Sequence, residues 1–336
     1  MTQAAIYGFA GLELTRDEAS FFGDAKPAGY ILFRRNIESK EQLRALTDRL
    51  RALEGHDDVP ILIDQEGGRV ARMRPPVWPA FPTGEAFDKL YRLAPSSAIE
   101  AARVNARALG LMLAECGVTV DCLPLVDVRQ EGASDIIGDR ALGSEPMQVS
   151  ALGRAQLDGL ASAGVVGVVK HIPGHGRALV DSHHELPFVA ASEEELAIDL
   201  EPFERLRDAP MGMVAHVVYE AWDKARPASQ SPVVIHDIIR ERIGFDGFLM
   251  SDDSCMGALS GRPGERAAAC VAAGCDVALP CDGVLDHNID VAKAVPALTP
   301  EGEARLARAM AMRFAPDDEM DFAEAVAKRD ALLALV

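Results

Sequence analysis

Residues 165–184 read VVGVVKHIPGHGRALVDSHH, and this stretch decides how the rest of the chain is interpreted. Its first five residues are apolar and mostly β-branched, which is typical of a short buried strand in a parallel sheet. Lys170 and His171 then stand at the carboxyl end of that strand. Proline and glycine residues follow and prevent regular structure. A loop so rich in ionisable groups, directly after a buried strand, indicates a functional site.

Seven further short apolar runs have the same character, and most of the segments between them are helix-forming. Regular alternation of this kind implies a parallel sheet, and a count of eight strands suggests a closed barrel. We therefore predict an α/β chain that forms one (β/α)₈ TIM-type barrel over residues 1–336, without a second domain. An open doubly wound sheet is the alternative, but no GxGxxG follows the first strand. The predicted strands cover about residues 6–9, 29–33, 60–63, 118–122, 165–169, 212–215, 248–250 and 276–279.

Helix signals between the strands are clear in several places. Thr15 and Glu18 have the spacing of a capping box, and so do Ser192 and Glu195. A long helix is expected from about Ser97 to position 116, and two helices, over about 300–314 and 322–335, finish the chain.

Composition limits the classes of partner. Asp and Glu outnumber Lys and Arg by 52 to 34, and the net charge of −18 argues against binding to nucleic acid or to anionic membranes. No apolar run approaches the ~20 residues of a membrane span, and the N-terminus lacks a signal-peptide pattern. The six cysteines form no CxxC, which fits a reducing compartment. We expect a cytoplasmic monomer.

Polar residues follow nearly every predicted strand, at the rim where (β/α)₈ barrels place their chemistry. They are Asp64, Asp121, Lys170, His171, His216 and Asp252. A metal-dependent hydrolase is an alternative reading of the histidines, with ligands drawn from His171, His175, His183 and His216. His171 and His175 have i,i+4 spacing, but a proline and a glycine lie between them and break the helix that would align them.

Six motifs, in the same order along the chain, resemble those of glycoside hydrolase family 3, and within it the bacterial β-N-acetylglucosaminidases of peptidoglycan recycling. The matches run from about residue 29 to residue 276, and the DSH pattern marks the N-acetylglucosaminidase branch. The motifs are GYILFRRN at 29–36, DQEGGRVAR at 64–72, GDRALG at 138–143, KHIPGHG…DSH at 170–183, MVAHVVY at 213–219 and GFDGFLMSDD at 244–253. One departure is Ser254-Cys255, where relatives usually have Leu-Ser before the methionine.

The resemblance implies a role for each matched residue. Asp252 is implied as the catalytic nucleophile, His183 as the general acid/base and Asp181 as its orienting partner. The groups implied to hold the terminal sugar are Asp64, Arg72, Arg140, Lys170 and His171. The implied reaction is retaining, exo-acting hydrolysis of terminal β-linked GlcNAc from muropeptide fragments, through a covalent glycosyl–aspartate intermediate and without a metal or organic cofactor.

The residue types suit this chemistry. Histidine titrates near neutrality, so one side chain can donate a proton in the first step and accept one in the second. An aspartate two residues earlier can hold the other ring nitrogen, as triad aspartates do. Arginine and lysine donate to sugar hydroxyls, and a carboxylate accepts from them. A barrel that binds sugar without turnover remains a third hypothesis.

Structural alternatives exist for several of these residues. Asp252 could merely cap the next helix, and its neighbour Asp253 is the better candidate for that role. Arg140 could form an ion pair with Asp139 or Glu145. His216 is expected below the pocket rather than in direct catalysis. Two aromatic residues, Trp78 and Phe81, could be ordinary packing or could flank the leaving-group side.

Overall fold

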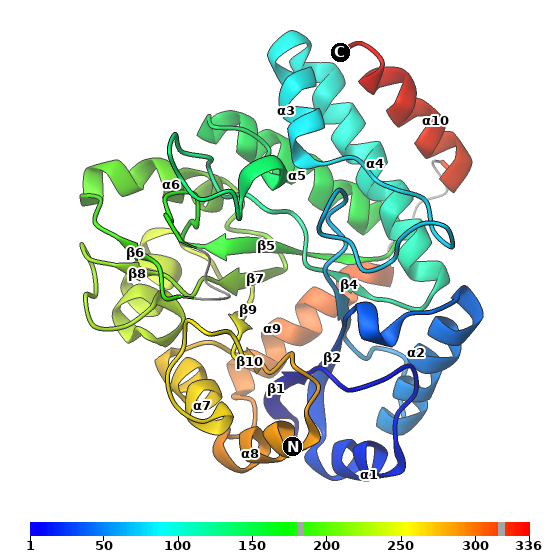
Figure 1. The fold of residues 1–336 in the computed structure, drawn as a ribbon, viewed down its shortest axis with the longest axis vertical. Helices are drawn as coiled ribbons and strands as arrows, with labels where there is room; N and C mark the ends of the chain where they lie inside the picture. The colour runs from blue at the N-terminus through cyan, green and yellow to red at the C-terminus, as the bar shows by residue number, and fades with distance from the viewer. Residues whose placement is uncertain (181–184, 315–319) are drawn as a thin grey trace.

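Eight parallel strands close into a barrel at the centre of the molecule (Figure 1). This computed structural model describes residues 1–180, 185–314 and 320–336. Each strand pairs with its neighbours in the order β1-β2-β3-β4-β5-β7-β9-β10, and β10 pairs with β1 to close the ring. The predicted (β/α)₈ barrel is confirmed. The barrel strands are β1 (Gln3–Tyr7), β2 (Pro27–Leu32), β3 (Ile61–Ile63), β4 (Val120–Asp121), β5 (Val166–Ile172), β7 (Met211–Val214), β9 (Phe248–Asp253) and β10 (Val277–Leu279).

Two strands run further toward the carboxyl rim than the apolar runs predict. β5 continues through Lys170 and His171 because Ile172 pairs with Val214 of β7. β9 continues to Asp253, which pairs with Leu279 of β10. The polar residues at these strand ends are therefore held by the barrel's own backbone ladder, which suits side chains that must keep a fixed geometry.

The helices surround the barrel, and α10 lies alongside α4 and α3 at one end of the molecule (Figure 1). The sequence predicts one helix from Ser97, but the structure has α3 followed directly by α4, which carries a proline in its first turn. Helix α8 was also not predicted. The helices are α1 (Arg16–Ala25), α2 (Lys40–Glu54), α3 (Gly84–Leu93), α4 (Pro95–Glu115), α5 (Pro146–Ser162), α6 (Glu193–Arg205), α7 (Pro263–Ala273), α8 (Leu285–Ala294), α9 (Pro300–Ala311) and α10 (Phe322–Leu333).

Shorter elements complete the chain. The segment η4 (Val234–Arg242) winds as a π-helix, and β6 (Phe188–Val189) pairs with β8 (Val218–Tyr219) outside the barrel. The 3₁₀ turns are η1 (Arg34–Asn36), η2 (Gly138–Arg140), η3 (Ala228–Gln230) and η5 (Met312–Phe314). Within the described ranges, no helix is long and apolar enough to cross a membrane.

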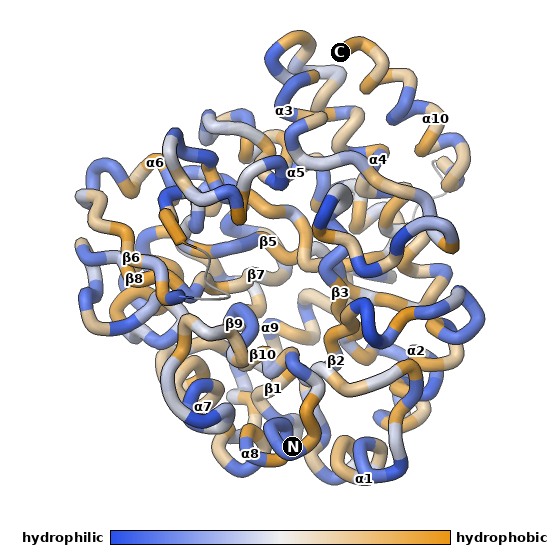
Figure 2. Tube along the Cα trace, in the orientation of Figure 1, coloured by the Kyte–Doolittle hydropathy of each residue, from blue (hydrophilic) through white to orange (hydrophobic). Residues whose placement is uncertain are grey.

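The barrel interior is filled with apolar side chains, so it is a packed core and not a channel. Each strand contributes to this inner layer, and a second apolar layer lies between strands and helices. Hydrophilic residues colour much of the outer helical surface (Figure 2). The inner layer includes Ile6, Ile31, Leu62, Val120, Val168, Met213, Met250 and Leu279. Three of these residues, Ile31, Met213 and Leu279, also line the pocket described next.

Candidate active site

A pocket of about 250 Å³ opens at the carboxyl ends of the strands. Its wall brings together residues that are far apart in the sequence, such as Asp64 after β3 and Asp252 in β9. All five predicted sugar-binding residues and the predicted nucleophile line it: Asp64, Arg72, Arg140, Lys170, His171 and Asp252. Asp121 does not line it. That carboxylate is fully buried beneath the rim, where it accepts a hydrogen bond from the Gln65 amide at 3.0 Å.

Asp64 joins two of the predicted sugar-binding cations. Its Oδ1 lies 3.0 Å from Lys170 Nζ and its Oδ2 lies 2.9 Å from Arg72 Nη2. Burial alone would raise the pKa of the Asp64 carboxyl, but the two cations outweigh it and hold that pKa below its ordinary value. Asp64 is therefore ionised over the whole physiological pH range and can accept from sugar hydroxyls.

Glu66 does not line the pocket, but it pairs with two residues that do, Arg140 and Lys170, and the sequence interpretation missed it. Its two carboxylate oxygens lie 2.7 and 2.8 Å from Arg140 Nη2 and Nε, and one of them is 2.7 Å from Lys170 Nζ. Burial opposes its ionisation, yet the Arg140 guanidinium and the Lys170 ammonium lower the pKa of Glu66 to about 2. The suggested pairing of Arg140 with Asp139 or Glu145 is thus wrong. Asp139 instead binds Arg69 Nε at 2.9 Å.

The available signal for Glu66 was its position two residues after Asp64, in the same strand-end segment. Residues 66, 140 and 170 are far apart in the sequence, and their separation does not indicate that they are in contact. They meet because β3, β4 and β5 are neighbours in the barrel, so the segments that follow these strands share one rim.

His171 is oriented by a buried carboxylate. Asp127, which follows β4, has Oδ2 at 2.7 Å from His171 Nδ1, and its Oδ1 accepts from the His171 amide at 3.1 Å. Burial disfavours the charged form, but the nearby histidines lower the pKa of Asp127 to about 2. An ionised carboxylate only accepts hydrogen bonds, so the proton resides on His171 Nδ1 and the other ring nitrogen is left for the pocket.

The adjacent carboxylates Asp252 and Asp253 both line the pocket but have different environments. Asp252 is 8% exposed and lines the pocket, and its Oδ1 accepts from the Asp253 amide at 2.8 Å. Burial would raise its pKa, but His171 and His216 lower it, so Asp252 is ionised. Such a carboxylate is suited to attack an electrophilic carbon.

Asp253 has a structural role, but it does not cap the next helix, because the N-cap of α7 is Arg262. Asp253 Oδ1 accepts from the amides of Cys255 at 2.8 Å and of Cys281 at 3.2 Å. These two bonds hold the turn after β9 against the turn after β10. Burial raises the pKa of Asp253 to about 6, so the two neighbouring aspartates are not equivalent acids.

The described histidines do not converge as metal ligands. His216 is fully buried, with Nδ1 at 2.6 Å from Ser229 Oγ and Nε2 at 3.0 Å from the Asp253 carbonyl, which agrees with its expected place below the pocket. His171 uses Nδ1 for Asp127. His175 is buried, and desolvation lowers its pKa to about 4.

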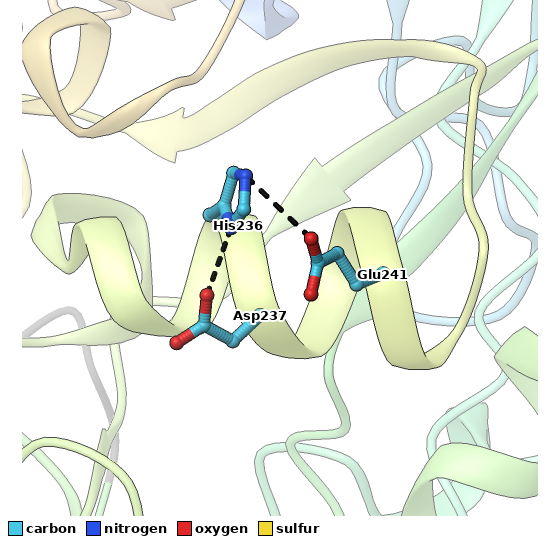
Figure 3. A group of neighbouring side chains, drawn as sticks. All are labelled: His236, Asp237 and Glu241. Atoms are coloured by element: carbon cyan, nitrogen blue, oxygen red, sulfur yellow. Dashed lines mark hydrogen bonds and ion pairs between the residues drawn. The ribbon is translucent and has the colours of Figure 1, made fainter.

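One cluster among the described residues has the spacing of metal ligands, and it lies elsewhere. His236, Asp237 and Glu241 project from η4, and all three are exposed (Figure 3). His236 Nδ1 is 2.8 Å from Asp237 Oδ1, and its Nε2 is 3.8 Å from Glu241 Oε1. None of the three lines the pocket. The described part of the chain thus offers no support for a metal-dependent site at the barrel rim.

Two predicted catalytic residues, Asp181 and His183, lie outside the described residues. The structure describes the start of their loop as far as Val180. Trp78 and Phe81 are 2% and 6% exposed, belong to the core and do not line the pocket. Of the two roles considered for these aromatic rings, ordinary packing is therefore the one observed.

Comparison with known proteins identifies the family. Residues 5–312 match the model of the glycosyl hydrolase family 3 N terminal domain. The chain is 39% identical over 312 residues to a beta-hexosaminidase of Chromobacterium violaceum, covering 89% of this chain and 84% of that protein. These matches confirm the predicted enzyme class, a glycoside hydrolase of the β-N-acetylhexosaminidase type.

Solved structures give the same result over nearly the full length. NagZ from Neisseria gonorrhoeae superposes with a TM-score of 0.88 at 32% identity, covering 99% of this chain and 98% of that one. The same protein in complex with N-trifluoroacetyl-D-glucosamine superposes with a TM-score of 0.85 at 31% identity, covering 99% and 97%. From its motifs, its barrel and these matches, the chain belongs to glycosyl hydrolase family 3.

Proposed function

We propose that this chain is an exo-acting, retaining β-N-acetylglucosaminidase that removes terminal β-linked GlcNAc from peptidoglycan fragments, such as GlcNAc–anhydroMurNAc muropeptides, in the cytoplasm. The observation that carries the proposal is the pocket itself, in which ionised Asp252 faces the group formed by Asp64, Arg72 and Lys170. The relatives named beta-hexosaminidase and the relative bound to a glucosamine derivative support the choice of sugar.

The size and charge of the pocket fit one neutral sugar. Its volume of about 250 Å³ lies below the ~300–1,000 Å³ typical of pockets for drug-sized ligands. The cations Arg72, Arg140 and Lys170 are each paired with Asp64 or Glu66. Because each of these three cations has a carboxylate partner, none of them is left unpaired to favour an anionic ligand. A monosaccharide with many hydroxyls can bind to both kinds of group.

The proposed mechanism has two steps. Asp252 attacks the anomeric carbon while His183 donates a proton to the glycosidic oxygen, so that the C–O bond breaks and a glycosyl–Asp252 ester forms. His183 then takes a proton from water, whose oxygen attacks the same carbon and releases Asp252. Asp181 orients His183 and increases its basicity. Each step inverts the anomeric carbon, so the β configuration is retained overall.

An assay of anomeric configuration tests the mechanism. Proton NMR of the first sugar released from an aryl β-N-acetylglucosaminide should show the β-anomer before mutarotation. Initial appearance of the α-anomer would rule out the two-step route. The assay should be run with and without inorganic phosphate, because glycosyl phosphate as the product would assign phosphorolysis instead of hydrolysis.

A second assay tests the substrate class. Release of GlcNAc from a purified GlcNAc–anhydroMurNAc peptide should proceed with a higher kcat/KM than release from chitobiose, as followed by mass spectrometry. A preference for chitobiose would keep the enzyme class and overturn the peptidoglycan assignment. We further propose that the enzyme acts as a monomer on small carbohydrates, which size-exclusion chromatography of the active enzyme can test.

A further inference from the structure

The first part of the catalytic loop is attached to the barrel through its backbone. Asp127 Oδ1 accepts from the amides of His171 at 3.1 Å and His175 at 2.6 Å. The Tyr219 hydroxyl donates to the Gly174 carbonyl at 2.7 Å. These three bonds hold the chain only as far as residue 175, so they do not set the direction in which it continues toward Asp181 and His183.

Arg177 makes the next attachment, and it does so with its side chain. Its Nε donates to Asp199 Oδ2 at 2.5 Å, and its Nη2 donates to the Glu195 carbonyl at 2.8 Å. Both partners lie on α6, so the guanidinium ties the loop to a helix outside the barrel. Arg177 is the only charged residue between Gly176 and Asp181, which follows it by four positions.

The Arg177–Asp199 pair is buried on the helix side and closely packed. The Asp199 side chain is 1% exposed, and burial raises the pKa of Asp199 to about 6 even beside Arg177. Gly174 has φ +131, and a Cβ there would lie 2.9 Å from Asp199 Cβ. A Cβ on Gly176 would lie 1.9 Å from the Val128 carbonyl oxygen. The chain thus reaches Arg177 along a path with little freedom.

Such a pair differs from the ion pairs on the surface of the same helix. Exposed pairs contribute little, because water screens them and both side chains are flexible. A carboxylate as buried as Asp199 is costly unless a cation compensates it, and removing that cation leaves the charge uncompensated. The geometry of Arg177 is therefore determined by Asp199. Arg177 holds the described start of the loop together with a backbone bond, in which the Ser134 amide donates to the Ala178 carbonyl at 2.9 Å.

We propose that Arg177 and Asp199 are positioning residues that hold the start of the catalytic loop, and that the proton transfer assigned to Asp181 and His183 depends on this attachment. This inference rests on the proposed function, because it assigns the acid/base role to that loop. Neither residue touches the sugar in this proposal. Their expected effect is on proton transfer alone, because they hold the loop to which the general acid is assigned.

The dependence on leaving group tests this proposal. A sugar leaving group needs a proton in the transition state, whereas dinitrophenolate leaves readily without one. For Arg177→Ala and Asp199→Asn we expect kcat/KM to fall about 10- to 100-fold on a GlcNAc-disaccharide, as for a small misplacement of a catalytic group. On dinitrophenyl β-N-acetylglucosaminide the fall should stay below about 3-fold. The double variant should be no worse than the worse single variant, since the pair acts as one unit.

Controls separate positioning from a general loss of structure. Arg205→Ala removes an exposed pair with Glu201 on the same helix and should leave both substrates unchanged. Arg177→Lys should restore part of the disaccharide activity because it keeps the charge. The thermal midpoint of each variant shows whether it is folded. If Asp199→Asn does not fold, the Arg177 variants still decide the question.

The outcomes distinguish the two proposals. An equal loss on both substrates, or no loss on either, would overturn the positioning role. If His183→Ala shows the leaving-group pattern and Arg177→Ala does not, only the positioning role is wrong. If the wild-type enzyme releases GlcNAc from neither substrate, the proposed function itself fails.

Discussion

The strand-end half of the pocket and its loop half are held in different ways. At the strand ends, Lys170 is nearly fully buried and its ammonium binds both Asp64 and Glu66. These charges sit on or next to barrel strands and satisfy one another before any sugar arrives. The described part of the loop is held by backbone bonds to Asp127, Tyr219 and Ser134 and by one guanidinium, that of Arg177.

In the proposed mechanism, the strand-end half of the pocket binds the sugar and the loop half carries out proton transfer. Charged groups on rigid strands are preorganised, so the free energy of sugar binding is not spent on arranging them. A change at the strand ends should therefore affect both stability and sugar binding. A change in the loop should affect proton transfer and leave binding and fold nearly intact.

The largest effect is expected at Asp252, the strand-end carboxylate that faces the pocket. Asp252→Ala should lower kcat by about 10⁴-fold or more, because no other group can form the glycosyl ester. The thermal midpoint should change little, since the carboxylate has one hydrogen bond to its neighbour's amide. Asp253→Ala is the matched control, and it should lower the midpoint while keeping measurable turnover. The reverse pattern would assign the nucleophile to Asp253.

His183 gives the next effect and tests the loop half. His183→Ala should lower kcat/KM about 10²–10⁴-fold on the disaccharide and much less on the dinitrophenyl glycoside. The comparison uses kcat/KM because kcat also includes the later hydrolysis step, which loses its base. Asp181→Asn should show the same pattern in weaker form. Equal losses on the two substrates would make His183 a binding residue.

Glu66 tests whether the strand-end charges are preorganised. Glu66→Gln keeps the shape but removes the charge, so KM should rise about 10-fold, in line with the ~1.5–3 kcal/mol of a charged hydrogen bond. The free energy of unfolding should fall by about 2–3 kcal/mol at pH 7. The sign of the pH effect follows from the pKa of Glu66, which is about 2 in the folded protein and 4.5 for an ordinary glutamate. The stabilisation is therefore present above about pH 4.5 and is lost as the pH falls toward 2.

Unfolding by urea at pH 7, 4 and 3 measures this effect. The difference between wild type and Glu66→Gln should shrink as the pH falls. Glu85→Gln is the control, because Glu85 forms an exposed i,i+4 pair with Lys89 and should change stability by less than about 0.5 kcal/mol. A difference that is constant with pH would mean that the Glu66 charge does not stabilise the fold.

The smallest effect is expected from metal removal. Treatment with a chelator should leave kcat/KM within about 2-fold of the untreated value, because acid/base and nucleophilic groups carry the proposed reaction. Elemental analysis verifies that the metal has been removed. His236→Ala, at the exposed cluster on η4, should be equally silent. Loss of activity that zinc restores would revive the metal-dependent hypothesis for the loop histidines.

Much of this arrangement could be predicted from the sequence. Short apolar runs separated by helices predicted the barrel, because burial on both faces and the βα alternation leave few other folds. Polar residues at the ends of the strands predicted that the site lies at the carboxyl rim of the barrel. The exact ends of β5 and β9 could not be predicted, since pairing of Ile172 with Val214 and of Asp253 with Leu279 depends on neighbours far along the chain.

The sequence by itself determined the barrel, the family and the residue types that reach the pocket. Only the tertiary structure decided which charges pair, so Glu66 and the orienting role of Asp127 emerged there. The two aspartates at residues 252 and 253 show why. They are chemically identical and both line the pocket, but they have different neighbours. Asp252 is ionised beside two histidines, whereas Asp253 accepts from two backbone amides and has its pKa raised to about 6.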